Sequence, residues 1–364
     1  MNELNLDIQN PYKYDVAKYC FNLFETMHIQ VIPWHNEKGY VFFSHPCYCY
    51  STVCKEIHDK YSDFVESPLD LLLSNKRMTF LNKIVAEQDF SLCQNCPKYR
   101  MRETTGFWDR DEFEYMFGYN HGSKCYDGFK YRHLTTILPL TIMFNLDNSC
   151  NLKCKTCRNG FIVKSHVLTD KDIDQLVYMA KRVECVSFGG DGEFFVSKNY
   201  RRMLAADLAK DSNIRNITLY TNGTMFTEKN WNTMHDASRQ LVRELKISID
   251  AATPETYAKV RGPIGWKLLM KNMPFIQRLK MTNRLNMTST FTISKYNVQD
   301  VAKFFDFAIG LGFDSVTFQF AREIFHPETG NRENFIIPDD ERADIIAYLT
   351  ALQKQYDCFR VRIE

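Results

Sequence analysis

Apolar and polar positions alternate along the chain in a way that predicts strands and helices in turn from residue 138 onward. The mostly apolar run 138–146 is typical of a short buried strand. Further strands are predicted at 183–188, 216–220, 244–250, 285–293 and 315–320. Helical stretches are predicted after them, near 198–210, 228–238, 265–279, 298–311 and 339–355. Strands separated by helices are typical of parallel β/α units, so the fold class is α/β, with a partial (β/α)6 TIM-like barrel.

Four polar loops follow the first four of these strands. They contain a cysteine triplet, the glycine-rich acidic run 189–193, the run 221–224, and the strand end 248–250. Each alone is compatible with an ordinary turn. In β/α folds, however, the chemistry sits at the carboxyl ends of the strands. The coincidence of four such loops therefore predicts one functional site.

The cysteine triplet consists of Cys150, Cys154 and Cys157, with the spacing C-x3-C-x2-C. Three thiolates on one loop can ligate three irons of a cubane cluster, and the fourth iron, with no cysteine nearby, stays open to a ligand that is not protein. Structural zinc prefers four protein ligands, which fits a triplet poorly. A disulfide framework fits worse, because 364 residues with 45% hydrophobic content need no covalent staples. The triplet therefore indicates redox chemistry on a bound ligand.

The first 136 residues predict a second metal site. A hairpin is predicted over 27–43 with its turn at 36–39. Two groups of cysteines flank an amphipathic stretch at 69–87, and the second group has the spacing C-x2-C. Thiols in this pattern suit either an iron–sulfur cluster or zinc, the latter with His45 or His58 as a further ligand. The polar segment 120–131 is the expected domain boundary.

Composition restricts the partners. The chain has 46 basic and 44 acidic residues, so it offers no electrostatic case for binding nucleic acid or an anionic membrane. No apolar run is long enough to span a bilayer, and the polar, acidic beginning does not predict a signal peptide. Reduced thiols and oxygen-sensitive clusters lead us to expect a cytoplasmic protein.

Residues 137–364 resemble the radical S-adenosylmethionine (SAM) enzymes. The resemblance rests on the triplet after the first strand, on Gly-Asp-Gly-Glu at 190–193, and on Lys-Ile-Ser-Ile-Asp-Ala-Ala-Thr-Pro-Glu-Thr-Tyr at 246–257. The last motif, continued by 259–262, is similar to the corresponding segment of the subgroup with auxiliary clusters. Two positions depart from the family pattern: Phe194 replaces the usual proline, and Thr156 stands where an aromatic residue is common.

The resemblance implies the cofactors and the reaction. Cys150, Cys154 and Cys157 would hold a [4Fe-4S] cluster, with SAM at its open iron. Reductive cleavage of SAM would give a 5′-deoxyadenosyl radical that abstracts a substrate hydrogen. SAM contacts are expected at the ammonium group, the ribose and the carboxylate, from Gly189, Gly190, Gly192, Glu193, Asn222, Ser248, Asp250 and Arg261. No catalytic residue is assigned.

The first segment resembles the SPASM and twitch modules that carry auxiliary clusters in the same family. By that resemblance Cys47, Cys93 and Cys96 ligate an auxiliary [4Fe-4S] cluster, and Cys20 is preferred as the fourth ligand over Cys49 and Cys54. The expected domains are a module at 1–130 and the barrel at 137–364. This order is inverted, because the module normally follows the barrel.

The subgroup implies a substrate class. Modification of a ribosomally made peptide is the first expectation, because this subgroup is rich in peptide modifiers. A dehydrogenase or epimerase acting on a sugar or aminocyclitol is the first alternative. A non-catalytic iron–sulfur or zinc protein is the second alternative. A reductant such as flavodoxin or ferredoxin is the expected protein partner. Gln319, Arg322 and Glu323, at and after the last predicted strand, are further candidates for substrate contact.

Overall fold

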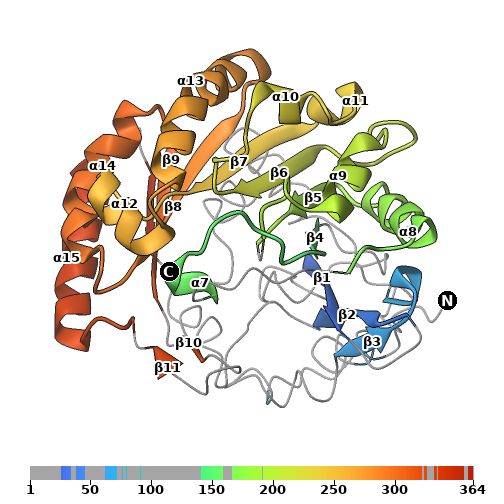
Figure 1. Cartoon of the computed structure of the whole chain (residues 1–364), viewed down its shortest axis with the longest axis horizontal. Coiled ribbons are helices and arrows are strands. Elements are labelled where there is room, and N and C mark those ends of the chain that lie inside the picture. The colour runs from blue at the N-terminus through green and yellow to red at the C-terminus, as the bar shows by residue number, and fades with distance from the viewer. Residues whose placement is uncertain are drawn as a thin grey trace, which may run out of the picture. The chain divides into compact units, whose positions relative to one another are not determined.

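The fold is described from a computed structural model (Figure 1). The residues that it describes are 26–33, 38–45, 62–71, 76, 79, 91, 141–158, 166–190, 192–321, 324–325, 332–333, 335–355 and 360–363. The chain divides into two compact units. The first unit comprises Met1–Asp147, His166–Phe188 and Arg202–Ile217, and the second comprises Asn148–Ser165, Gly189–Arg201 and Thr218–Glu364.

The first unit is built on a mixed sheet whose strands run in the order β5-β4-β1-β2-β3. Its strands are β1 (Thr26–Pro33), β2 (Tyr40–His45), β3 (Asp63–Val65), β4 (Thr141–Asn145) and β5 (Cys185–Phe188). Strands β1 and β2 form an antiparallel pair, which confirms the hairpin predicted at 27–43. Strand β1 also pairs in parallel with β4, as β4 does with β5. The hairpin therefore extends a parallel sheet rather than standing apart from it.

A buried carboxylate fastens this hairpin to helix α8 (Asp170–Ala180). Asp172 accepts hydrogen bonds from Lys38 Nζ at 2.7 Å and from Tyr40 Oη at 2.6 Å. It also closes a capping box with Thr169, the N-cap of the helix. Burial alone would raise the pKa of Asp172, but the hydrogen bonds from Lys38, Tyr40 and Thr169 bring it below its ordinary value. The carboxylate is therefore held in its charged form between the hairpin and the helix.

The substitution Asp172→Ala is expected to lower the free energy of unfolding by roughly 3 kcal/mol, because it leaves Lys38 and Tyr40 without their buried acceptor. Urea unfolding of both proteins measures the difference. Asp174→Ala, at an exposed position of the same helix, is the matched control and should change stability far less. Equal losses in the two variants would contradict the assignment.

The second unit contains a parallel sheet with the order β12-β9-β8-β7-β6. The strands are β6 (Asn216–Thr221, of which 218–221 belong to this unit), β7 (Val242–Ser248), β8 (Asn286–Ile293), β9 (Ser315–Phe320) and β12 (Arg360–Ile363). The pairs β7–β8, β8–β9 and β9–β12 are all parallel. Strands β10 (Ile324–Phe325) and β11 (Arg332–Glu333) form a separate antiparallel pair.

Helices cover the outer side of this sheet. Figure 1 shows α13 (Gly265–Asn283), α14 (Val301–Gly310) and α15 (Asp339–Gln355) around strands β7, β8 and β9. The core between them is aromatic: the Phe291 ring lies 4.6 Å from that of Phe304 and 5.5 Å from that of Phe318. The period of two along β8 and β9 sends these rings to one side. The intervening Thr290, Thr292 and Gln319 are then left on the opposite side, where they are not part of this core.

The predicted fold class is confirmed. From β4 to β9 the chain alternates strands with helices, as in a partial (β/α)6 TIM-like barrel, and the strands predicted at 138–146 through 315–320 are present. The helix predicted at 228–238 is two short helices, α10 (Glu228–Trp231) and α11 (Asp236–Arg239), and that at 198–210 is the shorter α9 (Lys198–Ala205). Helices α8 and α12 (Pro254–Arg261) were not predicted. Among the described residues, every helix is too short or too polar to cross a membrane.

Candidate metal and cofactor site

The cysteine triplet lies on the loop that follows β4 and enters the short helix α7 (Lys155–Arg158). Cys150 and Cys154 are half-buried and Cys157 is exposed. Burial raises the pKa of the Cys154 thiol to about 11; Arg261 opposes this shift, and the nearby thiols Cys157 and Cys150 add to it. The charge of Arg261 alone therefore does not offset the effect of burial on the Cys154 thiol.

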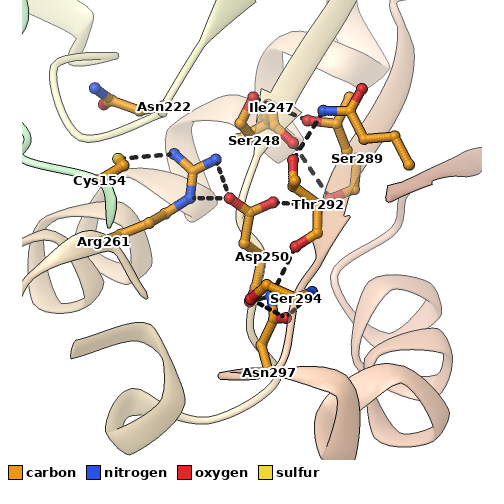
Figure 2. A network of polar contacts seen from close by, with 12 residues as sticks. Cys154, Asn222, Ile247, Ser248, Asp250, Arg261, Ser289, Thr292, Ser294 and Asn297 are labelled. Carbon is orange, nitrogen blue, oxygen red and sulfur yellow. Dashed lines mark hydrogen bonds and ion pairs between the residues drawn. The ribbon is translucent and has the colours of Figure 1, made fainter. Parts of the chain in front are cut away.

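Three nitrogen donors point at these sulfurs. The Leu152 amide and the Asn222 side chain donate to Cys150 Sγ at 3.5 and 3.7 Å. Arg261 Nη1 donates to Cys154 Sγ at 3.8 Å (Figure 2). Hydrogen bonds to ligating sulfurs are one of the means by which proteins tune iron–sulfur clusters. The donor set therefore suits thiolates that carry a metal cluster.

Asn222 joins the cysteine loop to the end of β6. Its Nδ2 also donates to Asn151 Oδ1 at 3.0 Å, and its Oδ1 accepts from the backbone and hydroxyl of Thr224. Asn151 in turn donates to the Thr224 hydroxyl at 2.7 Å. The side chain of Asn272, on α13, holds the same turn by donating to the carbonyls of residues 223 and 224. This closed ring of amides and hydroxyls fixes the position of Cys150.

Glu193 lies at the centre of the loop that follows β5. It is fully buried, and its carboxylate accepts from the Thr221 hydroxyl at 2.9 and 3.0 Å and from the Asn222 amide at 2.7 Å. Its own amide donates to the carbonyl of Ser149, next to the first cysteine. Burial raises the pKa of Glu193 to about 7 in spite of these donors. Because its partners are Thr221 and Asn222, the carboxylate faces the end of β6 and the loop that follows it.

The glycines of this loop differ in what they require. Gly189 has a φ of +105°, and a Cβ there would lie 2.9 Å from the carbonyl oxygen of Tyr220. Gly190 has a φ of +135°, which also favours glycine. Gly192 is half-buried, and Asp191 of the same motif lies outside the described residues. Phe194, at the position where the family has proline, is buried against Phe195 and Phe226.

Asp250 and Arg261 form a buried ion pair beside the triplet. Arg261 Nε and Nη2 both donate to Asp250 Oδ2, at 2.8 and 2.6 Å (Figure 2). The other oxygen, Oδ1, accepts from the backbone amide of Thr292 at 2.6 Å. Burial would lower the pKa of Arg261, but the charges of Asp250 and Cys154 raise it above its ordinary value. The guanidinium is therefore always charged and is aimed at Cys154.

Sequence reasoning missed several residues that hold this pair. Asn297 Nδ2 donates to the carbonyl of Asp250 at 2.8 Å, and Asp300 accepts from the amide of Ala252 at 2.9 Å. Thr290 donates to the Ser248 hydroxyl at 2.8 Å. Gln319, which the sequence did suggest as a candidate for substrate contact, donates to Thr292 Oγ1 at the same distance. The alternation of polar and apolar residues along β8 is the signal that could have placed Thr290 and Thr292 on one face of the strand. Asn297 and Asp300 carry no such signal, because loop polarity alone does not show which residue a side chain will reach.

The structure brings several predicted site residues together in two groups. Asn222 contacts Cys150 and Glu193, and Arg261 contacts Asp250 and Cys154. The expected ligands Cys20, Cys47, Cys93 and Cys96 lie outside the described residues, as do Cys49, Cys54, Arg322 and Glu323. Within the described ranges, three His, Cys, Asp or Glu side chains nowhere converge closely enough to ligate a single metal ion. Thiolates of a cubane bind different irons and need no common focus, so the cysteine loop fits a cluster better than a lone zinc ion.

Residues 144–308 match the family model described as the Radical SAM superfamily. This part of the chain is therefore similar to a radical SAM domain. That family implies a [4Fe-4S] cluster and SAM as cofactors, and the match supports an enzyme. The matched range contains all three cysteines of the triplet as well as Glu193, Asp250 and Arg261.

Solved structures that are similar to this chain include two of SuiB from Streptococcus suis. One, bound to S-adenosylmethionine, is 16% identical over 62% of this chain and 48% of its own, with a TM-score of 0.46. The other, bound to the precursor peptide SuiA, is 14% identical over 79% and 62%, with a TM-score of 0.48. Native anSMEcpe with bound AdoMet is 17% identical over 62% and 64%, with a TM-score of 0.49. The chain thus spans about half of the first structure, and no curated protein matches it significantly.

The raised pKa of Glu193 predicts a pH-dependent stability. Because the folded protein binds this proton more tightly than the unfolded chain, stability should fall as the pH rises from 4.5 to about 7. A shift of this size corresponds to about 3 kcal/mol. Urea unfolding of the apoprotein at pH 5 and pH 8 should therefore show a smaller pH dependence in Glu193→Gln than in the wild type.

The matched control is Glu228→Gln, at an exposed position of α10, which should retain the full pH dependence of the wild type. Identical pH dependence in Glu193→Gln and the wild type would show that burial does not hold the proton on this carboxyl.

Proposed function

We propose that this chain is a radical SAM enzyme that cleaves SAM reductively and abstracts a hydrogen atom from its substrate. The observation that carries the proposal is the set of three thiols on one loop, with nitrogen donors aimed at two of the sulfurs, inside the region that matches the radical SAM family. In this proposal Cys150, Cys154 and Cys157 hold the [4Fe-4S] cluster. When bound, the cluster and SAM supply a 5′-deoxyadenosyl radical, with the electron coming from a reductant such as flavodoxin or ferredoxin.

The protein groups position these cofactors. Asn222 and Arg261 orient the sulfurs of Cys150 and Cys154 by hydrogen bonds. Glu193 holds the loop after β5 against the loop after β6, and its carboxylate is occupied by Thr221 and Asn222. We therefore assign the contact with the SAM ammonium to backbone groups of the loop at 189–192, where Gly190 and Gly192 allow close approach.

The ribose contact is assigned to Ser248. Its hydroxyl lies at the end of β7 and is half-buried, and it accepts from Thr290, which leaves its own proton available for donation. Asp250 is the weaker choice, because both of its carboxylate oxygens already accept hydrogen bonds from Arg261 and Thr292. A contact between the SAM carboxylate and Arg261 remains a prediction.

The substrate is proposed to be a peptide, on the family association with auxiliary-cluster enzymes. The side chains around the strand ends support a substrate rich in hydrogen-bonding groups, because Thr290, Thr292 and Gln319 offer hydroxyls and an amide. The same groups suit a sugar or aminocyclitol, so this alternative stands. Peptide amides and sugar hydroxyls both match such a surface, whereas an apolar substrate would not.

The triplet is expected to be indispensable for SAM cleavage. After anaerobic reconstitution with iron and sulfide, the wild type should form 5′-deoxyadenosine from SAM in the presence of dithionite, as measured by chromatography. The variant with alanine at positions 150, 154 and 157 should form at least 100-fold less, because it has no thiolates to hold the cluster.

Cys185→Ala is the matched control, since Cys185 is buried in β5 and belongs to no proposed ligand set. It should retain cleavage. A wild-type protein that holds the cluster but forms no 5′-deoxyadenosine would favour the non-catalytic iron–sulfur alternative.

We further propose that residues 1–130 form an auxiliary-cluster module and 137–364 the barrel domain. The ligands proposed for the auxiliary [4Fe-4S] cluster are Cys20, Cys47, Cys93 and Cys96. Support comes from the spacing of these cysteines, the second pair of which has the pattern C-x2-C.

Iron content separates this assignment from zinc. The wild type should contain about eight irons per chain, and the triplet variant about four, because each cubane carries four. Metal analysis of anaerobically purified protein is the measurement. About four irons together with one zinc in the wild type would show that the first segment binds zinc instead.

A further inference from the structure

The ion pair of Arg261 and Asp250 has a fixed orientation relative to the cysteine loop. Of the three guanidinium nitrogens, Nε and Nη2 face the carboxylate, whereas Nη1 faces Cys154 Sγ at 3.8 Å (Figure 2). Arg261 and Asp250 are only 7% and 2% exposed. The positive end of the pair therefore points at the sulfur and the negative end points away from it, with little water to screen either charge.

The backbone and its neighbours keep Asp250 in this position. Its φ is +59°, a left-handed conformation that is unfavourable in a residue other than glycine. Thr292 N donates to the second carboxylate oxygen, and Asn297 Nδ2 donates to the carbonyl. Asn297 itself accepts from Ser294, which closes the network. Because Asp250 is held from three sides, it cannot rotate away and release Arg261.

We infer that Arg261 sets the reduction potential of the cluster held by Cys154, and that Asp250 is the positioning residue that aims the guanidinium and limits its charge. This inference rests on the proposed function. It assigns Arg261 to the cluster sulfur, through the hydrogen bond from Nη1 to Cys154 Sγ.

The physical argument concerns the charge of the two redox states. Reduction adds one negative charge to the cluster, so a buried positive charge at one of its sulfurs stabilises the reduced state and raises the potential. Asp250 opposes this effect from a greater distance. A higher potential makes the single electron easier to obtain from a biological reductant, which is what an enzyme of this class requires.

The test is a redox titration of the full-length protein, reconstituted anaerobically and followed by electron paramagnetic resonance without SAM. The signal of the triplet cluster is identified by its loss in the variant with alanines at 150, 154 and 157. In Arg261→Met, the ratio of reduced to oxidised cluster at a fixed applied potential should fall about tenfold, which is a downward shift of about 59 mV for one electron. Asp250→Asn should shift the potential upward, because it removes negative charge and leaves an amide oxygen to accept from Arg261.

Two further variants separate charge from structure. Arg261→Lys keeps the charge without the planar fork, so its potential should lie between those of the wild type and Arg261→Met. Arg239→Met is the matched control, because Arg239 pairs with Asp236 on α11 and contacts none of the cysteines; its potential should equal that of the wild type. Iron content is measured for every protein.

Each outcome decides the question. Unchanged potentials in Arg261→Met and Asp250→Asn, with the cluster intact, would overturn the inference and leave the proposed function standing. An upward shift in Arg261→Met would also overturn it, because it indicates that water has entered and stabilised the more negative reduced state. If Arg261→Met does not fold or load iron, Asp250→Asn decides alone: an upward shift supports the inference and no shift refutes it. A wild type that takes up no cluster at 150–157 would refute the proposed function itself.

Discussion

The buried carboxylate of Glu193 is the constraint on which the rest of the site depends. It lies where three loops meet: its amide donates to the loop that carries the cysteines, and its oxygens accept from Thr221 and Asn222 after β6. A carboxylate without water must be satisfied by donors, so the loops are held in the one arrangement that supplies them. Asn222 extends this arrangement to Cys150. The position of the first sulfur is therefore set by a residue that sits on a different loop and ligates nothing.

Much of the fold of the second unit could be predicted from the sequence, because apolar and polar residues alternate along β8 and β9. Two helices could also have been found from local signals. Thr169 followed by Asp172 is the pattern of a capping box, and Thr253-Pro254 is that of an N-cap with proline in the first turn. The parallel pairing of β1 with β4 could not be predicted from the local sequence, because alternating apolar and polar residues predict a strand but not the strand with which it pairs.

The sequence predicts which residues belong to the site better than it predicts which of them contact one another. The motifs place Cys154 and Asp250 in segments that follow strands, where a β/α fold gathers its functional loops. Arg261 comes at the end of helix α12. The sequence does not show that Arg261 would meet Asp250 and a cysteine, because an arginine at the end of a helix has many acidic groups within reach. That choice depends on Thr292 and Asn297, which fix Asp250 from another strand and loop. Likewise, the direction of the Glu193 carboxylate depends on donors that lie almost thirty residues away in the chain.

Gly189 shows why loss of activity in a glycine variant is an unsafe guide to ligand contacts in this fold. Its positive φ and the closeness of the Tyr220 carbonyl to the space that a Cβ would fill give packing a sufficient reason for glycine at this position. A methyl group there would displace the end of β6, and with it the turn that holds Cys150. An inactive Gly189→Ala protein would then have a misplaced thiolate, although no nucleotide had ever touched residue 189.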